Sequence, residues 1–127
     1  MDPAVPSHVR ERASRIRLVG FDVDGTLTDG RLWFDGEGRE SKAFHAQDGL
    51  GLRMLEDSGI AVAWITARDS ASARARARDL RLTHIHTGVH DKLACLRELC
   101  TSLGISPADA AYMGDDLNDL EIGRAHV

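Results

Sequence analysis

The chain has 127 residues, of which 43% are hydrophobic and 28% charged, so its composition suits a single domain with a core of its own. The net charge of −4 gives no bulk attraction for nucleic acid. No segment is apolar for long enough to span a membrane, and the N-terminal MDPAVPSHVRER lacks the apolar stretch of a signal peptide. We therefore expect a cytoplasmic protein that binds neither nucleic acid nor a membrane.

Residues 1–14 read as a lead-in that is in part helical, and the sequence then alternates between strand and helix patterns. Short apolar runs predict buried strands, apolar residues at helical spacing predict helices, and two β-like pieces around Asp-Gly and Gly signals predict a hairpin. We expect, in chain order, a strand over 16–21, a hairpin within 26–45, a helix over 48–58, a strand over 60–65, a helix over 70–80, a strand over 83–86, a helix over 91–103 and a strand over 110–113. This alternation predicts a doubly wound parallel α/β sheet without a second domain.

Two of these helices are predicted on different grounds. The helix over 48–58 has Leu50, Met54 and Leu55 on one side as its apolar face, and Gly59 stands at its end. The segment 70–80 alternates Ala and Arg with the period of a strand. Both residue types are strong helix formers and poor strand formers, so we expect a helix there.

The cysteines and histidines of this sequence predict neither a disulfide nor a transition-metal site. Cys95 and Cys100 stand five residues apart in one predicted helix and point in different directions, so we expect two free thiols. His84 and His86 share one face of a predicted strand, but no acid or cysteine stands beside them in the sequence. We expect ordinary polar surface residues there, not a transition-metal site.

Polar side chains gather where the predicted strands end. Asp22 and Asp24 follow the first strand, Thr66 the second and Asp115 the fourth, and Lys92 lies shortly after the third. The carboxyl ends of parallel strands lie on one edge of a sheet, so these groups can converge. A cluster of acids needs a compensating cation, and hard divalent metals take oxygen ligands. Acids, a hydroxyl and cations together predict a phosphoryl-transfer site with an aspartate as nucleophile.

These motifs resemble the haloacid dehalogenase (HAD) superfamily. Asp22-Val-Asp24-Gly-Thr-Leu-Thr is similar to its motif one, Thr66 to motif two, Lys92 to motif three, and Gly114-Asp115-Asp116-Leu-Asn118-Asp119 to motif four. The resemblance implies a HAD-like Rossmannoid domain over residues 15–120, with a hairpin inserted after the first strand.

Three further segments narrow the resemblance. Residues 44–55, 65–70 and 87–96 are similar to the capless subfamily typified by 3-deoxy-D-manno-octulosonate 8-phosphate (KDO 8-phosphate) phosphatase. The resemblance implies that no cap domain is present. It also implies Mg²⁺-dependent hydrolysis of an acidic sugar phosphate through an aspartyl-phosphate, in lipopolysaccharide precursor synthesis.

The resemblance assigns roles to the acids. Asp22 would attack the phosphorus and bind Mg²⁺. Asp24 would protonate the leaving alcohol and then activate water, while its backbone carbonyl binds the metal. Asp115 would be the remaining protein ligand of the metal. Asp116 or Asp119 would orient the metal shell from outside, and Thr66 and Lys92 would hold the phosphoryl oxygens.

Contacts to the sugar acid are also implied by the resemblance. Arginines suit a substrate that carries a carboxylate and a phosphate. The implied substrate contacts are Asp24, His45, Ala46, Gln47, Asp48, Gly49, Arg53, Arg68 and Arg76. The chain departs from the family pattern at Ala67, where glycine is common, and at Gln47, where a basic residue is common. The second departure bears on sugar specificity.

The capless family assembles as tetramers through the hairpin, so Trp33 and Phe34 are expected to lie in a subunit interface. Two alternatives to a KDO 8-phosphate phosphatase stay open. One is a phosphatase for a nonulosonate (sialic-acid-type) 9-phosphate. The other is a non-catalytic tetramerisation domain of a cytidylyltransferase, which would lose its acids, whereas Asp22, Asp24 and Asp115 are all present here.

The end of the chain is expected to be foreign to the protein. Family members continue for several dozen residues, with another strand and a helix. The last seven residues, EIGRAHV, match one reading frame of a common sequencing adapter. We therefore expect a C-terminally truncated domain that lacks its last strand, with residues 121–127 as a non-native tail. A genuine short terminus is the alternative.

Overall fold

The computed structural model describes residues 4–115, and its centre is a four-stranded sheet. The strands lie side by side in the order β5-β4-β1-β6, and all three neighbouring pairs are parallel. Their bounds are Leu18–Phe21 for β1, Ala61–Ile65 for β4, His84–His86 for β5 and Ala110–Met113 for β6. The predicted α/β class is confirmed, and so is each of the four predicted strands.

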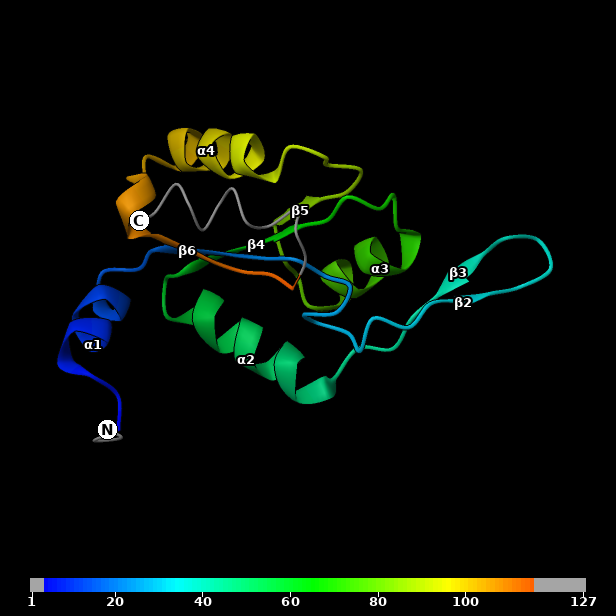
Figure 1. Ribbon diagram of the computed structural model, residues 1–127, viewed down its shortest axis with the longest axis horizontal. Helices are drawn as coiled ribbons and strands as arrows, with labels where there is room; N and C mark the ends of the chain where they lie inside the picture. The colour runs from blue at the N-terminus through cyan, green and yellow to red at the C-terminus, as the bar shows by residue number, and fades with distance from the viewer. Residues whose placement is uncertain (1–3, 116–127) are drawn as a thin grey trace.

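Helices cover both faces of the sheet (Figure 1). On one face Ala63 and Ile65 pack with residues of α4 (Lys92–Leu103). On the other face Val62 and Trp64 pack with residues of α2 (Ala46–Asp57) and α3 (Ala71–Asp79). This alternation along β4 is the period-two pattern of a strand that is buried on both sides. Helix α1 (Ser7–Ser14) precedes the sheet, and a 3₁₀ turn, η1 (Pro107–Asp109), leads into β6.

The predicted hairpin consists of β2 (Trp33–Phe34) and β3 (Glu40–Ser41), which pair antiparallel and project from the body of the molecule (Figure 1). It is the only insertion after β1 within residues 4–115, and no cap domain is found among them. The expectations about a last strand and about a non-native tail concern residues 116–127, which lie outside the described part of the chain.

The apolar face predicted for α2 was wrong in two of its three residues. Leu50 and Met54 are each 64% exposed, whereas Leu52 and Gly49 are buried. The side chains of α3 explain this rotation, because a Cβ on Gly49 would overlap the Arg76 guanidinium and contact Leu80. The helix therefore turns its glycine toward α3, so Leu50 and Met54 face outward.

The prediction of a helix over 70–80 is confirmed as α3. The Ser70 hydroxyl accepts a hydrogen bond from the backbone N–H of Ala73 and caps the helix. Ala73 and Ala77 are buried against the sheet. The small alanines let α3 lie close to the strands, while the arginines between them lie on the other sides of the helix.

Both cysteines are free thiols, as predicted. Burial raises the pKa of the Cys100 thiol, and burial and then the nearby Glu98 raise that of Cys95. Both are therefore protonated and unreactive at neutral pH. Among the described helices, none is long and apolar enough to cross a membrane.

Gly51 offers a direct test of the α2 geometry. It lies inside the helix, is exposed, and a Cβ placed on it would meet no atom within 4 Å. Gly51→Ala should therefore stabilise the protein by about 0.5–1 kcal/mol, since alanine loses less backbone entropy in a helix. The free energy of unfolding in urea measures the change.

The matched control is Gly104→Ala. That position is equally open, but it ends α4 with φ at 67°, a left-handed conformation that disfavours alanine by about 1–2 kcal/mol. The control should lose stability. A loss at Gly51 as well would contradict the position of α2.

Candidate active site

A cavity of about 350 Å³ opens at the carboxyl edge of the sheet. It collects the five side chains that the sequence places at strand ends, although they come from segments up to ninety-three residues apart. Its lining consists of Asp22, Asp24, Gly30, Thr66, Ala67, Arg68, Lys92 and Asp115. The parallel order of β4, β1 and β6 accounts for this convergence, because the three strands end on the same edge.

Asp22 and Lys92 form the buried centre of the cavity wall. The Lys92 ammonium donates to Oδ1 of Asp22 at 2.9 Å, and both side chains are almost fully buried. Lys92 opens α4, whose cap is the Asp91 carboxylate accepting from the N–H of Ala94. The ion pair thus joins the end of the central strand to the start of a helix.

Thr66 is held by the strand that neighbours it. Its backbone N–H donates to the carbonyl of His86, and its carbonyl accepts from Val89. The hydroxyl accepts a long hydrogen bond, 3.4 Å, from the N–H of Arg68. The side chain is 2% exposed, so the turn that contains Thr66 has a fixed geometry at the cavity wall.

The loop after β1 curls around the Thr28 hydroxyl, which accepts from the N–H groups of Gly25 and Gly30 at 3.2 and 3.1 Å. Gly25 has φ at +84°, and a Cβ there would overlap the carboxylate of Asp115. The missing side chain therefore lets Asp115 lie against the backbone that directly follows Asp24.

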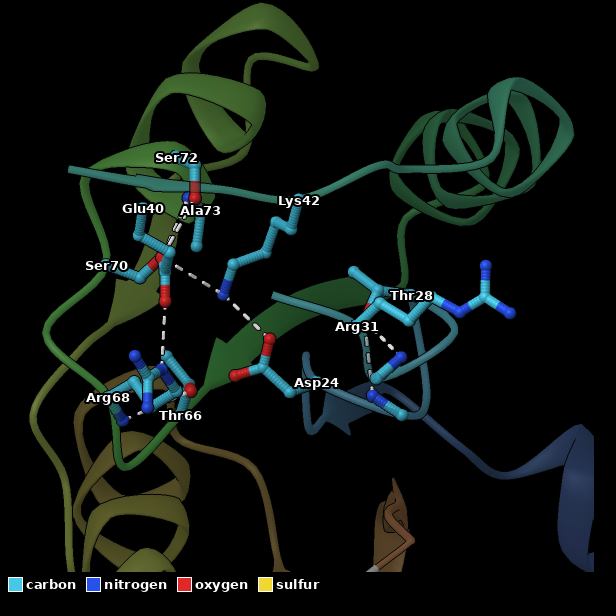
Figure 2. Close-up of polar contacts among 12 residues, drawn as sticks. Asp24, Thr28, Arg31, Glu40, Lys42, Thr66, Arg68, Ser70, Ser72 and Ala73 are labelled. Atoms are coloured by element: carbon cyan, nitrogen blue, oxygen red, sulfur yellow. Dashed lines mark hydrogen bonds and ion pairs between the residues drawn. The ribbon is translucent and has the colours of Figure 1, made fainter. Parts of the chain in front are cut away.

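A network of charged and hydroxyl side chains borders the cavity, whose lining includes Asp24 and Arg68 of this network (Figure 2). The Lys42 ammonium donates to Oδ1 of Asp24 at 2.7 Å and lies 3.4 Å from Oε2 of Glu40. Glu40 also accepts from Arg68 at 2.9 Å, from Ser70 at 2.9 Å and from Ser72 at 3.1 Å. The hairpin strand β3 is thereby joined to Asp24 and to the segment that follows β4.

Glu40 and Lys42 belong to this site, although no motif in the sequence singles them out. They stand two residues apart around the end of a short strand, so the period of two places them on one face. That spacing was the available signal. It does not reveal that this face turns toward Asp24, because the hairpin's orientation depends on contacts with distant residues.

The sequence-predicted sugar contacts divide into two groups. Arg68 lines the cavity with Asp22 and Asp24, whereas His45 and Asp48 line a separate cavity of about 380 Å³ together with Thr26–Asp29 of the loop after β1. Ala46 and Gln47 are exposed in the first turn of α2, where the Gln47 N–H donates to the imidazole of His45.

Arg53 and Arg76 do not reach the cavity that contains Asp22. Arg53 donates to the carbonyls of Leu80 and Arg81 and pairs with Asp57. Arg76 pairs with Asp79 and packs against Gly49, which is buried at the α2–α3 contact. Within this chain their substrate roles stay predictions. Asp116 and Asp119, the predicted outer acids, lie outside the described residues.

The donors at this edge suit a hard divalent cation. Asp22 and Asp115 supply carboxylates, and the Gly25 position brings the Asp115 carboxylate close to the backbone after Asp24. Among residues 4–115, no three His, Cys, Asp or Glu side chains converge as a metal site.

Glu40 is the titrating group that depends most on this network. Burial alone would raise its pKa, but hydrogen bonds from Ser70 and Arg68, the charge of Lys42 and a hydrogen bond from Ser72 outweigh burial. They hold the pKa of Glu40 below its usual 4.5. The ionised carboxylate therefore stabilises the folded state above that pH, and the stabilisation is lost as the pH falls through the lowered pKa.

Glu40→Gln should flatten the acid side of the stability profile. The wild-type protein should lose unfolding free energy below about pH 4.5 more steeply than the variant, because Gln does not take up a proton. Urea denaturation at a series of pH values measures both slopes. Parallel profiles would mean that the network around Glu40 is absent in solution.

Known proteins resemble this chain over nearly all of its length. No family model matches it. The 3-deoxy-D-manno-octulosonate 8-phosphate phosphatase KdsC of Yersinia pestis is 44% identical over 115 residues, which cover 91% of this chain and 62% of that protein. This chain therefore spans about three fifths of the length of that relative.

Two solved structures extend the comparison. The 3-deoxy-D-manno-octulosonate 8-phosphate phosphatase of Moraxella catarrhalis, in complex with magnesium, phosphate and KDO, is 46% identical with a TM-score of 0.88, over 92% of this chain and 67% of that one. The cobalt-bound Haemophilus influenzae enzyme is 39% identical with a TM-score of 0.84, over 91% and 67%. With the same fold and this level of identity, the chain belongs to the KDO 8-phosphate phosphatase family of the HAD superfamily.

Proposed function

We propose that this chain is the phosphatase domain of an enzyme that hydrolyses 3-deoxy-D-manno-octulosonate 8-phosphate to KDO and phosphate. The observation that carries the proposal is the meeting of Asp22, Asp24, Thr66, Lys92 and Asp115 around one cavity. The family relationship supports the same reaction, since the Moraxella catarrhalis relative holds magnesium, phosphate and KDO. We further propose that the enzyme is cytoplasmic and that it acts in lipopolysaccharide precursor synthesis.

Asp22 is the proposed nucleophile. One carboxylate oxygen forms a bond to phosphorus while the bond from phosphorus to the sugar oxygen breaks, which leaves an aspartyl-phosphate. Lys92, 2.9 Å from Oδ1 of Asp22, orients the carboxylate, and it can also stabilise the charge on the phosphoryl oxygens. The Thr66 hydroxyl lines the same cavity and can donate to a phosphoryl oxygen.

Asp24 is the proposed general acid and base. It gives a proton to the departing sugar oxygen and then takes one from the water that attacks the phosphorus. The water's oxygen leaves in inorganic phosphate, and Asp22 returns to its free carboxylate. Both acids line the same cavity, and each is paired with its own lysine: Asp22 with Lys92 and Asp24 with Lys42.

Magnesium is the proposed cofactor, held by the carboxylates of Asp22 and Asp115 and the backbone carbonyl of Asp24. When bound, it neutralises phosphoryl charge and lets an anionic nucleophile approach an anionic substrate. Asp116 or Asp119 is the proposed partner of the metal's outer shell.

The sugar acid is proposed to extend from Arg68 toward the cavity lined by His45 and Asp48. The remaining proposed substrate contacts of the assembled enzyme are Ala46, Gln47, Gly49, Arg53 and Arg76.

We also propose a homotetramer formed through the hairpin, since Trp33 and Phe34 are 52% and 57% exposed on it. Apolar rings of this size on a projecting hairpin suit a subunit interface.

Asp22→Asn should reduce phosphate release from KDO 8-phosphate by at least about 10³-fold, because the amide is a poor nucleophile. The assay compares the purified wild-type and variant proteins over a panel that includes a nonulosonate 9-phosphate. Chelation should abolish the wild-type activity and added Mg²⁺ should restore it. Unchanged turnover by Asp22→Asn would contradict the assignment, and preference for the 9-phosphate would favour the alternative substrate.

Gly25→Ala should weaken Mg²⁺ binding by about tenfold or more, because its Cβ would displace the carboxylate of Asp115. Isothermal titration with Mg²⁺ measures the affinity without turnover. Gly36→Ala is the control, since a Cβ on that hairpin glycine meets nothing within 4 Å. Equal affinity in both variants would place Asp115 outside the metal site.

A further inference from the structure

We propose that Lys42, supported by Glu40, is a positioning residue that fixes the carboxyl group of Asp24 for proton transfer to the leaving group. The inference rests on the proposed phosphatase function and adds the hairpin to the catalytic machinery. It assigns Lys42 no contact with substrate.

The first observation is the burial of the ion pair. The Lys42 side chain is 0% exposed, while those of Asp24 and Glu40 are 21% and 12% exposed. Water cannot replace the carboxylates around an ammonium in this position, so Lys42 is kept at 2.7 Å from Asp24. In an exposed pair of the same residues, water would compete for both charged groups, and the lysine would restrain the carboxylate only weakly.

The second observation is that Glu40 is itself immobilised. Arg68 and the hydroxyls of Ser70 and Ser72 all donate to its two oxygens. These hydrogen bonds hold the Glu40 carboxylate in place and tie the hairpin to the first turn of α3. Because Glu40 is fixed, the Lys42 ammonium beside it is also fixed, and it in turn restrains the Asp24 carboxyl group.

The third observation is that Lys42 engages only one oxygen of Asp24. An ammonium can only donate, so Oδ1 serves as the acceptor. Among residues 4–115, no hydrogen bond involves Oδ2. Figure 2 shows this second oxygen directed away from Lys42, toward the side of Thr66 and Arg68, which line the cavity. The arrangement leaves Oδ2 to exchange a proton with a ligand.

The test compares two substrates that differ in their need for an acid. A sugar phosphate has an alkoxide leaving group that must be protonated, whereas p-nitrophenyl phosphate releases a stable phenolate. Lys42→Met keeps the aliphatic stem and removes the charge. It should lower kcat/KM for the sugar phosphate by about 10²-fold but lower it for p-nitrophenyl phosphate by less than about threefold. Lys42→Arg, which keeps the charge, should recover part of the loss.

Arg39→Met is the matched control. Arg39 lies in the same hairpin and pairs with Asp35 on the surface, so its loss should change neither rate. Equal loss with both substrates in Lys42→Met would overturn the proposal, because a merely structural defect would affect every substrate alike.

A second measurement reads the ion pair without turnover. The unfolding free energies of Asp24→Asn, Lys42→Met and the double variant form a double-mutant cycle. The double variant should lose clearly less than the sum of the single losses, since each single change leaves a buried partner unpaired. Additive losses would overturn the ion pair. Absence of turnover of both phosphates by the wild-type protein would instead refute the proposed function, and with it the catalytic part of this inference.

Discussion

A buried carboxylate at the end of the central strand requires a cation beside it, and the rest of this site follows from that requirement. Asp22 is nearly inaccessible to solvent, and without compensation its charge would oppose folding. Lys92, which is far from Asp22 in the sequence, supplies the cation from the start of α4. The pair therefore fixes where α4 begins relative to β1, and Lys42 meets the same requirement for Asp24.

The sheet and the meeting of polar side chains at its carboxyl edge could be predicted because their signals are local. Apolar runs such as Val62–Ile65 fix buried strands, and helices between them force parallel pairing. Parallel pairing in turn brings strand ends to one edge, so the meeting of Asp22, Thr66 and Lys92 followed from their place after each strand. Even the misleading Ala-Arg alternation of α3 was resolved by the intrinsic preference of these residues for helix.

The features that could not be predicted depend on the packing of distant segments. The spacing of Leu50 and Met54 predicts the inner face of α2, but the close approach of Gly49 to α3 rotates the helix and exposes them. Glu40 gave no sign in the sequence that it gathers four partners, because three of these follow β4. The sites of Arg53 and Arg76 likewise depend on the α2–α3 contact.

The central claim is that Asp22 carries the phosphoryl group during turnover. An aspartyl-phosphate is an acyl phosphate, so borohydride added during steady-state turnover should reduce that one side chain to an alcohol, and peptide mass spectrometry can locate it. A homoserine is expected at position 22, and only when both substrate and Mg²⁺ are present. Reduction at another aspartate, or continued turnover with position 22 left unmodified under trapping conditions, would contradict it.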